Sequence, residues 1–421
     1  MNESVSAQTA SSTNDANARP AITMSEPLDA RVVLLTHYVP LYQLPIYQQL
    51  ANRIADFRVL LSTKIEPNRH FEPRWDGLNV NLQKTVTLKR RWKHDAGFND
   101  TLYVHLPYDT TWQLRRLKPD VVLSLELGFR SCAASIYRML HRRSRLILCT
   151  FMSEHTERGR GVMRAATRRA LIRRADALTY NGPSCHRVLR KLGADDHRLF
   201  PFPYAANPAC VYDGVLETRP PAALGRLLYV GQMNQRKGVQ AMFHQVVDFA
   251  RRHPNQPLRL TMIGEGPLRE SLTRRETPEN LQTHFVGNVP AERLPEHLSQ
   301  QDAMIFPTLA DEWGLVVNEA LHSWLPVIGS SLAQASTTLI EEGVNGWLYD
   351  PRDPSQLASC LKRWLACDQA SIARMQVACR RSVRERTPEA ACDGLLNAIN
   401  FVLERQRGKT KSQNPLEDID A

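Results

Sequence analysis

Short apolar runs alternate along the chain with longer segments of helical length. The runs are rich in Val, Ile and Leu, which is typical of strands buried on both faces of a parallel sheet. The predicted strands of the first half are Val32–Thr36, Arg58–Ser62, Val121–Leu125, Arg145–Thr150 and Ala177–Asn181. Those of the second half are Leu227–Gly231, Leu258–Gly264, His284–Gly287, Ala303–Pro307 and Val327–Ser330. Between the later strands, helical spacing predicts helices over Val239–His253, Val316–Trp324 and Pro354–Leu365.

A proline-bearing stretch without strand character, Asn207–Gly225, divides the two series of strands. The pattern therefore predicts an α/β fold of two Rossmann-like, doubly wound domains that face each other across a cleft. The expected parts are residues 29–210, a linker at 211–225, residues 226–385 and a C-terminal helix at 386–405. Residues 1–28 and 406–421 are polar and are expected to be disordered tails.

Composition narrows the class of protein. The chain has 421 residues, of which 43% are hydrophobic and 23% charged, as in ordinary soluble globular domains. No run of about 18 apolar residues exists, so no transmembrane helix is expected. The first 28 residues lack the basic start and apolar core of a secretory signal. The eight cysteines form no Cys-x-x-Cys pair. We expect reduced thiols and a cytoplasmic protein.

The net charge of +11 is concentrated in one stretch. Between Arg142 and Arg198 there are fourteen Lys or Arg and five Asp or Glu. Five arginines three or four residues apart predict a basic helix surface: Arg160, Arg164, Arg168, Arg169 and Arg173. Such a surface suits nucleic-acid phosphates, anionic lipid headgroups or an anionic acceptor, although a merely solvated helix is also open. Nucleic acid is disfavoured because aromatic residues are sparse there.

Three strand-to-helix turns of the second unit carry glycine. In the first, Gly231 and Gln232 precede Arg236 and Lys237, and this lysine can neutralise a phosphate unless the turn is an ordinary charged loop. In the second, Gly264-Glu-Gly266-Pro opens a helix, and its glycines allow close approach of a ligand. A dinucleotide fingerprint would need a third glycine where Arg269 stands, so a nicotinamide site is rejected.

The third turn runs from Asp311 through Gly314 to Glu319, between a strand and a helix. Gly314 permits a tight turn, after which the N–H groups of Leu315 and Val316 at the helix start can bind a diphosphate. The Glu319 carboxylate can accept two hydrogen bonds from vicinal ribose hydroxyls. Stabilisation of the first helical turn is its alternative role.

The pattern Asp311-x7-Glu319, with Gly231…Lys237-Gly238, Gly264-Glu-Gly-Pro and Phe285-Val-Gly-Asn-Val, resembles the family-4 retaining glycosyltransferases of the GT-B fold. The resemblance covers about Arg31 to Leu403 and is strongest from Leu227 to Asp350.

This resemblance implies a nucleotide-sugar donor, UDP- or GDP-linked, in the second domain and an acceptor in the first. By analogy, Glu319 binds the ribose, Lys237 and Arg236 face the diphosphate, and Asp311 contacts the transferred sugar. The remaining donor-binding positions are expected at Gly231, Gln232, Gly264, Gly266, Gly314, Leu315 and Val316. Two residues depart from the family: Asp311 replaces the usual Glu, and Gln232 replaces the usual Arg.

The first domain offers fewer signals. Its opening loop, with His37, resembles the acceptor-side loop of the family but lacks its glycine pair. His155, beside Glu154 at a strand end, is the candidate for contact with the transferred sugar, so Asp311, His155 and Lys237 form the predicted catalytic set. Arg164, Arg168 and Arg173 are expected to meet an acceptor or an anionic membrane. We expect a lipid-linked or lipopolysaccharide-type glycan acceptor and work at the inner face of a bacterial inner membrane.

No metal and no cofactor are predicted. The lone Asp-x-Asp of the chain, Asp418-Ile-Asp420, lies in the expected tail. A sugar-nucleotide epimerase of the same fold remains an alternative, although epimerases lack the Asp311-x7-Glu319 pattern. A phosphorylase would need a longer chain and pyridoxal phosphate. A catalytically silent basic scaffold that binds membranes or nucleic acid is the non-enzymatic alternative.

Overall fold

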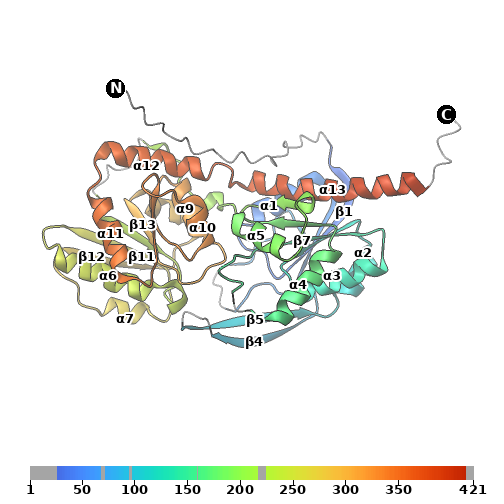
Figure 1. Ribbon diagram of the computed structural model, residues 1–421, viewed down its shortest axis with the longest axis horizontal. Coiled ribbons are helices and arrows are strands. Elements are labelled where there is room, and N and C mark those ends of the chain that lie inside the picture. Colours follow the sequence, from blue (N-terminus) through green and yellow to red (C-terminus); the bar gives the residue numbers. More distant parts are fainter. Residues whose placement is uncertain (1–25, 68–71, 94–96, 159, 217–223, 414–421) are drawn as a thin grey trace, which may run out of the picture.

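The computed structural model describes residues 26–67, 72–93, 97–158, 160–216 and 224–413. These residues form two α/β domains, each built on a parallel sheet (Figure 1). The sheet of the first domain has the order β3-β2-β1-β6-β7-β8-β9. The sheet of the second has the order β12-β11-β10-β13-β14-β15. Both sheets grow outward in two directions from their first strand, so the predicted doubly wound architecture is confirmed.

The strands match the predicted apolar runs closely. The strands of the first sheet are β1 (Leu28–Thr36), β2 (Ile54–Leu61), β3 (Asn79–Leu82), β6 (Val121–Leu125), β7 (Arg145–Cys149), β8 (Ala177–Tyr180) and β9 (Leu199–Pro201). Those of the second are β10 (Arg226–Val230), β11 (Leu258–Ile263), β12 (Leu281–Gly287), β13 (Ala303–Phe306), β14 (Val327–Ser330) and β15 (Gly346–Tyr349). Strands β3, β9 and β15 were not predicted, because they are edge strands of only three or four residues.

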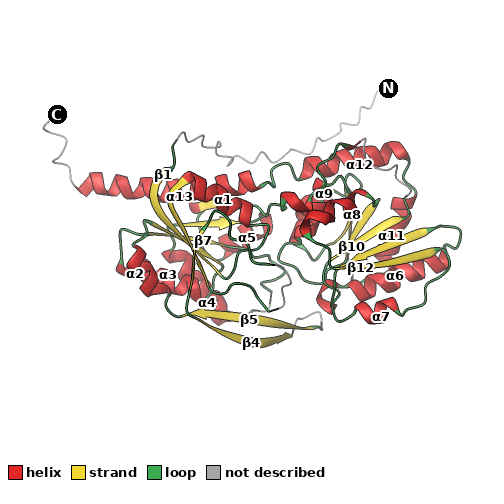
Figure 2. Ribbon diagram, turned by 180° about the vertical axis from the view of Figure 1, so that it is seen from behind, coloured by secondary structure: helices red, strands yellow, loops and turns green. Residues whose placement is uncertain are grey.

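An antiparallel hairpin of β4 (Thr85–Lys93) and β5 (Asn99–Pro107) lies outside the first sheet, as Figure 2 shows. The sequence did not predict it, because the β4 run is basic rather than apolar. The hairpin reaches the second domain, since β5 contacts the residues of η4 (Gln235–Lys237).

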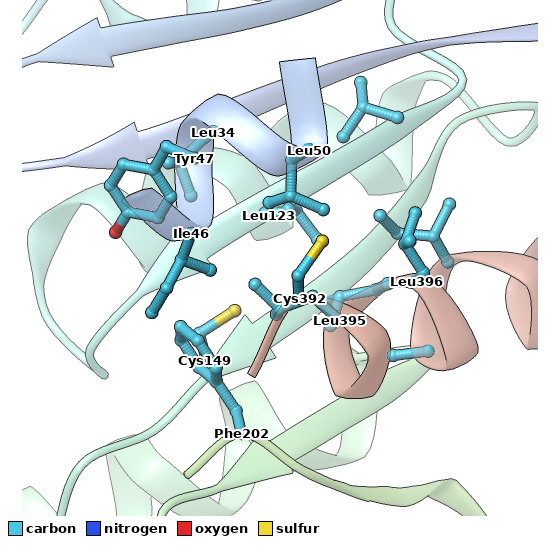
Figure 3. Close-up of a cluster of buried hydrophobic side chains, with 14 of the residues drawn as sticks. Leu34, Ile46, Tyr47, Leu50, Leu123, Cys149, Phe202, Cys392, Leu395 and Leu396 are labelled. Carbon is cyan, nitrogen blue, oxygen red and sulfur yellow. The ribbon is translucent and has the colours of Figure 1, made fainter. Parts of the chain in front are cut away.

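Helices cover both faces of the first sheet. One face is covered by α2 (Thr110–Leu117), α3 (Phe129–Leu140), α4 (Val162–Arg174) and α5 (Pro183–Lys191). The other is covered by α1 (Leu44–Arg53) and α13 (Pro388–Gln413). Figure 3 shows this second core, where Leu395 and Leu396 of α13 pack beside Ile46 and Leu50 of α1.

The C-terminal helix differs from its prediction. It continues through Gln413 instead of ending at residue 405, so the polar segment from 406 is helical up to that point. Extending a helix that is already anchored needs no new nucleation, which explains why polar residues continue it. The helix also returns to the first domain, where Asp393 pairs with Arg53 of α1. Of the expected tails at 1–28 and 406–421, residues 1–25 and 414–421, with Asp418 and Asp420, lie outside the described residues, and Leu28 is already part of β1.

The second sheet is covered in the same way. Helices α6 (Val239–Arg252), α7 (Arg269–Thr273) and α11 (Pro354–Leu365) pack on one face. Helices α8 (Leu294–Ser299), α9 (Leu315–His322) and α10 (Gln334–Leu339) pack on the other, and α12 (Gln369–Ser382) contributes to both cores. No helix in the described part of the chain has the length and apolar content needed to cross a membrane.

Candidate donor site and domain interface

The predicted charged residues of the second domain meet where its strand order reverses. Strands β10 and β13 are neighbours in the sheet, and each is followed by a loop at its carboxyl end. Lys237 comes from the loop after β10 and Asp311 from the loop after β13, and the Lys237 ammonium pairs with the Asp311 carboxylate. The Arg236 guanidinium lies 3.3 Å from the other carboxylate oxygen of Asp311 and donates to the Ala310 carbonyl at 3.0 Å. Ligands of doubly wound sheets bind at such points.

Asp311 is held as an anion by these two cations. Burial by itself would raise its pKa, but the charges of Lys237 and Arg236 outweigh burial, and the pKa of Asp311 is lowered. The Thr308 hydroxyl lies 3.4 Å from the same carboxylate. Asp311 therefore orients both cations.

Glycine at position 238 allows the β10 and β13 loops to pack together. Gly238 has φ 64°, and a Cβ there would lie 2.1 Å from the Pro307 carbonyl oxygen. The preceding turn is closed by the Asn234 side chain, which accepts a 3.0 Å hydrogen bond from the Lys237 backbone N–H. The Lys237 ammonium also lies 5.9 Å from the centre of the Phe306 ring. These contacts fix the position of Lys237.

Helix α9 begins directly after Gly314, which has φ 107°. A Cβ on Gly314 would lie 2.6 Å from the Phe306 ring, so only glycine fits this turn. The helix starts at Leu315, one position before the predicted Val316. Leu315 and Val316 occupy its first turn, where backbone N–H groups have no partner within the helix. N–H groups at a helix start can bind an anion, and the diphosphate contact at Leu315 and Val316 stays a prediction.

Glu319 lies on α9, half-buried beside the chain segment that joins the domains. Its carboxylate hydrogen-bonds with Cys210, in the turn η2 (Pro208–Cys210). Burial raises the pKa of Glu319 to about 7. Within the described part of the chain Glu319 forms no ion pair, unlike Asp311. Glu319 therefore lies outside the Lys237 cluster and is not in a packed core. This location does not contradict its predicted role at a ribose.

Gly264 and Gly266 lie against the backbone of the neighbouring β10 loop. A Cβ on Gly264 would lie 2.1 Å from the Gly231 carbonyl oxygen, and one on Gly266 would lie 2.5 Å from the Met233 carbonyl oxygen. What these glycines admit is therefore the backbone of the neighbouring β10 loop. Gln232 accepts from the Tyr229 hydroxyl through its carbonyl and from Asn234 through its side chain, at 2.8 and 3.2 Å. The two loops are joined by the Met233 N–H, which donates to the Glu265 carbonyl at 2.8 Å.

His155 connects the domains at this site. It is half-buried in the loop between β7 and α4, and its Nε2 lies 3.4 Å from the carbonyl of Leu309, in the loop that carries Asp311. Glu154, by contrast, is paired with Arg187 and Lys191 at 2.8 and 2.6 Å. His37 packs edge-to-face on Tyr38 after β1, with ring centres 4.4 Å apart.

The prediction of a continuous arginine surface is wrong for Arg168. Arg164 and Arg173 are exposed on α4, but Arg168 is buried and pairs with Glu157. Position 168 shares the inward face of α4 with Leu171 and Ile172, at three- and four-residue spacing. Arg168 therefore faces the interior near the domain interface and cannot contact a membrane.

Sequence reasoning missed several residues at the interface. Glu312 is solvent-exposed yet has protein of both domains around it. This partial loss of hydration and the negative charges of Glu126 and Asp311 raise its pKa to about 7, against the opposing charges of Arg160 and Arg168. Glu126 follows β6 with φ 65°, a strained conformation for a residue with a side chain.

Gln334 and Trp313 tie the domains together. The Gln334 side chain donates to the Met152 carbonyl at 3.2 Å and accepts from the Cys185 N–H at 3.2 Å. The Trp313 ring stacks on Tyr204, with centres 5.5 Å apart. No local pattern identifies such contacts, because each joins segments more than 100 residues apart. Within the described residues, no group of three or more His, Cys, Asp or Glu side chains could hold a metal ion.

Part of the second domain is similar in sequence to a known protein family. Residues 225–367 match the profile of the family described as glycosyl transferases group 1. The matched region lies in the second domain, and the chain has the GT-B fold. The matched region is the one that carries Lys237, Asp311 and Glu319.

Two curated glycosyltransferases are similar to part of the chain. D-inositol 3-phosphate glycosyltransferase of Corynebacterium kroppenstedtii is 30% identical over 155 residues, which is 35% of this chain and 34% of that protein. GDP-mannose-dependent alpha-mannosyltransferase of Corynebacterium glutamicum is 27% identical over 168 residues, which is 40% of this chain and 38% of that protein. The chain thus spans little more than a third of the length of these curated relatives.

Solved structures match nearly the whole chain. Anabaena HepE in complex with UDP covers 88% of this chain and 99% of its own, with a TM-score of 0.65 and 12% identity. A glycosyltransferase from Rickettsia africae covers 90% of this chain and 100% of its own, with a TM-score of 0.65 and 11% identity. At such identity these similarities establish the fold.

Proposed function

We propose that this protein is a retaining glycosyltransferase. It moves a sugar from a UDP- or GDP-linked donor to a cell-envelope glycan or a lipid-linked acceptor, without an obligatory metal. The observation that carries the proposal is the meeting of Lys237 and Asp311 at the strand-order reversal of the second domain, next to the open start of α9. UDP in the HepE structure and GDP-mannose in the name of a relative support a nucleotide-diphosphate donor.

The chemistry follows from charge. When the bond between the sugar and the diphosphate breaks, negative charge grows on the leaving phosphate. Lys237, oriented by Asp311, and the N–H groups at the start of α9 offer positive charge and donors for it. These groups lie in place before the donor arrives, so little reorganisation is needed. Glu319 would hold the ribose and thereby align the anomeric carbon with the acceptor.

The acceptor is proposed to lie on the first domain. His155 brings that domain to within hydrogen-bonding distance of the Asp311 loop. The exposed Arg164 and Arg173 of α4 favour an anionic acceptor or membrane. Peripheral work at the inner face of a bacterial inner membrane is part of the same proposal.

A donor screen tests this function. Thermal unfolding is measured with a panel of UDP- and GDP-sugars, and nucleotide release is followed for each sugar nucleotide that raises the melting temperature. A bound donor at 100 times its Kd should stabilise the protein by about 2.7 kcal/mol. Glu319→Ala should remove both the shift and the slow nucleotide release. Glu404→Ala, on the exposed side of α13, is the matched control and should retain both.

Other outcomes separate the alternatives. Interconversion of two sugar nucleotides without release of nucleotide would identify an epimerase. Absence of any donor-induced shift would favour a silent scaffold and refute the transferase. The proposed independence from metal predicts equal rates with EDTA and with Mg²⁺, measured as nucleotide release.

A further inference from the structure

Helices α2, α3 and α4 form one outer layer of the first domain. They pack side by side over the same face of the sheet, and α3 contacts both of its neighbours (Figures 1 and 2). Together the three helices contain nine arginines and no aspartate or glutamate. We call the outward side of this layer the α2–α4 face. Arg130 and Arg168 are buried and Arg138 pairs with Asp176. The outward charge therefore comes from the six exposed arginines, Arg115, Arg116, Arg164, Arg169, Arg173 and Arg174.

Large apolar side chains are exposed on the same face. The most exposed are Val162 and Met163 at the start of α4, with 83% and 87% of their surface accessible. Helix α3 adds an outward stripe of Phe129, Ile136, Met139 and Leu140, and α2 adds Trp112. A soluble surface seldom gathers so many large apolar groups, and such patches mark interaction sites.

Arginines border these apolar groups. Arg164 and Arg169 follow Met163 on α4 and are exposed, and Arg173 is exposed one turn further on. On α2, the Arg116 guanidinium lies 5.8 Å from the centre of the Trp112 ring. Apolar side chains with a basic border are the pattern of helices that lie in the interface of a bilayer.

The charged and apolar side chains of the α2–α4 face indicate which kind of partner binds there. A second copy of the chain would bring arginines against arginines, which repel each other. Nucleic acid would satisfy the arginines but leave Val162, Met163 and the α3 stripe without apolar partners. A bilayer with anionic headgroups satisfies both, because acyl chains receive the apolar groups and headgroup phosphates receive the arginines.

We propose that the α2–α4 face docks on an anionic membrane, with Val162 and Met163 inserted at the boundary of headgroups and acyl chains. Arg164, Arg169 and Arg173 contact lipid phosphates around this point. The loop that carries His155 leads directly into α4, so docking places the domain interface close to the membrane surface. The inference rests on the proposed function only for its purpose, delivery of a lipid-linked acceptor, and vesicle binding requires no transfer.

Vesicle sedimentation of the full chain tests the docking. Vesicles are made of phosphatidylcholine alone or of phosphatidylcholine and phosphatidylglycerol in equal parts. The wild type should sediment with the anionic vesicles, and Val162→Ser with Met163→Ser should weaken this binding about tenfold or more. Val215→Ser with Val377→Ser removes two exposed valines elsewhere and should bind as the wild type does.

A second variant tests the charge. Arg169→Glu with Arg173→Glu should abolish the preference for anionic vesicles. Both residues are exposed, so folding is checked by an unchanged melting temperature. Unchanged vesicle binding in both double variants would overturn the proposal. So would a wild type that ignores vesicles and forms dimers, or one that binds only an acidic protein.

Nucleotide binding separates this inference from the proposed function. Thermal shifts with donor should be the same in the wild type and in Val162→Ser with Met163→Ser. Lost vesicle binding with a retained donor shift is the expected result for that variant. A wild type that binds donor but no vesicles refutes the docking alone, and one that binds vesicles but no donor refutes the transferase alone.

Discussion

Replacement of Glu319 by glutamine should stabilise the free protein while weakening its hold on the donor. The carboxylate lies half-buried beside Cys210, where burial raises its pKa from 4.5 to about 7. Glutamine keeps the size and hydrogen-bonding capacity of the side chain but carries no charge. The two effects have opposite signs because the charge is costly in the empty site and useful to a ribose.

The effect of Glu319→Gln on the free energy of unfolding follows from the raised pKa of Glu319. Below pH 4.5 the carboxyl is protonated in both the folded and the unfolded chain and adds no pH dependence. Between pH 4.5 and about 7 the folded chain holds the proton more tightly, so the free energy of unfolding falls as the pH rises. Above that range the loss amounts to about 2–3 kcal/mol. Glu319→Gln should recover it, raising the melting temperature of the second domain by roughly 5–10 °C at pH 8.

The effect of Glu319→Gln on nucleotide affinity has the opposite sign. A hydrogen bond to a charged group contributes about 1.5–3 kcal/mol, so Glu319→Gln should weaken nucleotide binding about 10- to 100-fold at pH 8. In the wild type, affinity should also fall as the pH drops below about 7, where Glu319 takes up its proton. The variant should lack this pH dependence.

Calorimetry and nucleotide titration between pH 5 and pH 8 measure both effects. Glu312→Gln is the matched control, because the pKa of Glu312 is also raised to about 7 but Glu312 is not a predicted nucleotide contact. Its affinity for free nucleotide should equal that of the wild type. A Glu319→Gln protein that is less stable at pH 8, or that binds nucleotide unchanged, would refute the reasoning.

Three further variants test the site and its frame. Lys237→Met should lower nucleotide affinity and the rate of nucleotide release about 100-fold or more, because Asp311 would keep its negative charge without its main partner. Steady-state assays of nucleotide release measure this loss. Gly314→Ala should cost about 1–3 kcal/mol of stability, because φ 107° is strained and the Cβ would meet Phe306; urea unfolding measures it. Asp302→Ala should lower the free energy of unfolding by about 3–5 kcal/mol, because it removes the carboxylate that lies 2.6 Å from the guanidinium of the partly buried Arg226. Denaturant unfolding measures this loss.

Controls distinguish these effects from general damage. Lys237→Arg keeps the charge and should retain part of the activity that Lys237→Met loses. Gly193→Ala is also at a positive φ, 94°, but its Cβ would meet nothing within 4 Å, so it should cost less than Gly314→Ala. Equal losses at the two glycines would contradict the role assigned to the Phe306 contact.

Much of the fold could be predicted from local pattern. The strands at Val121–Leu125 and Val327–Ser330 and the helix at Pro354–Leu365 were predicted to the residue. A buried parallel strand is a continuous apolar run, so its signal lies in neighbouring residues. The same holds for Gly314, where a tight turn before a helix could be anticipated from residue type and order alone.

Other features depend on which distant segments meet. The inward face of Arg168, the pairing of Lys237 with Asp311 and the exposure of Glu312 at the domain interface were decided by packing. The same is true of Gly264 and Gly266, which make room for backbone. Burial and charge at a position are set by every chain segment around it, whereas periodicity along the sequence reports only the nearest few residues. That difference explains why the sequence alone predicted the two sheets and the motif positions, while the tertiary structure decided what each motif side chain contacts.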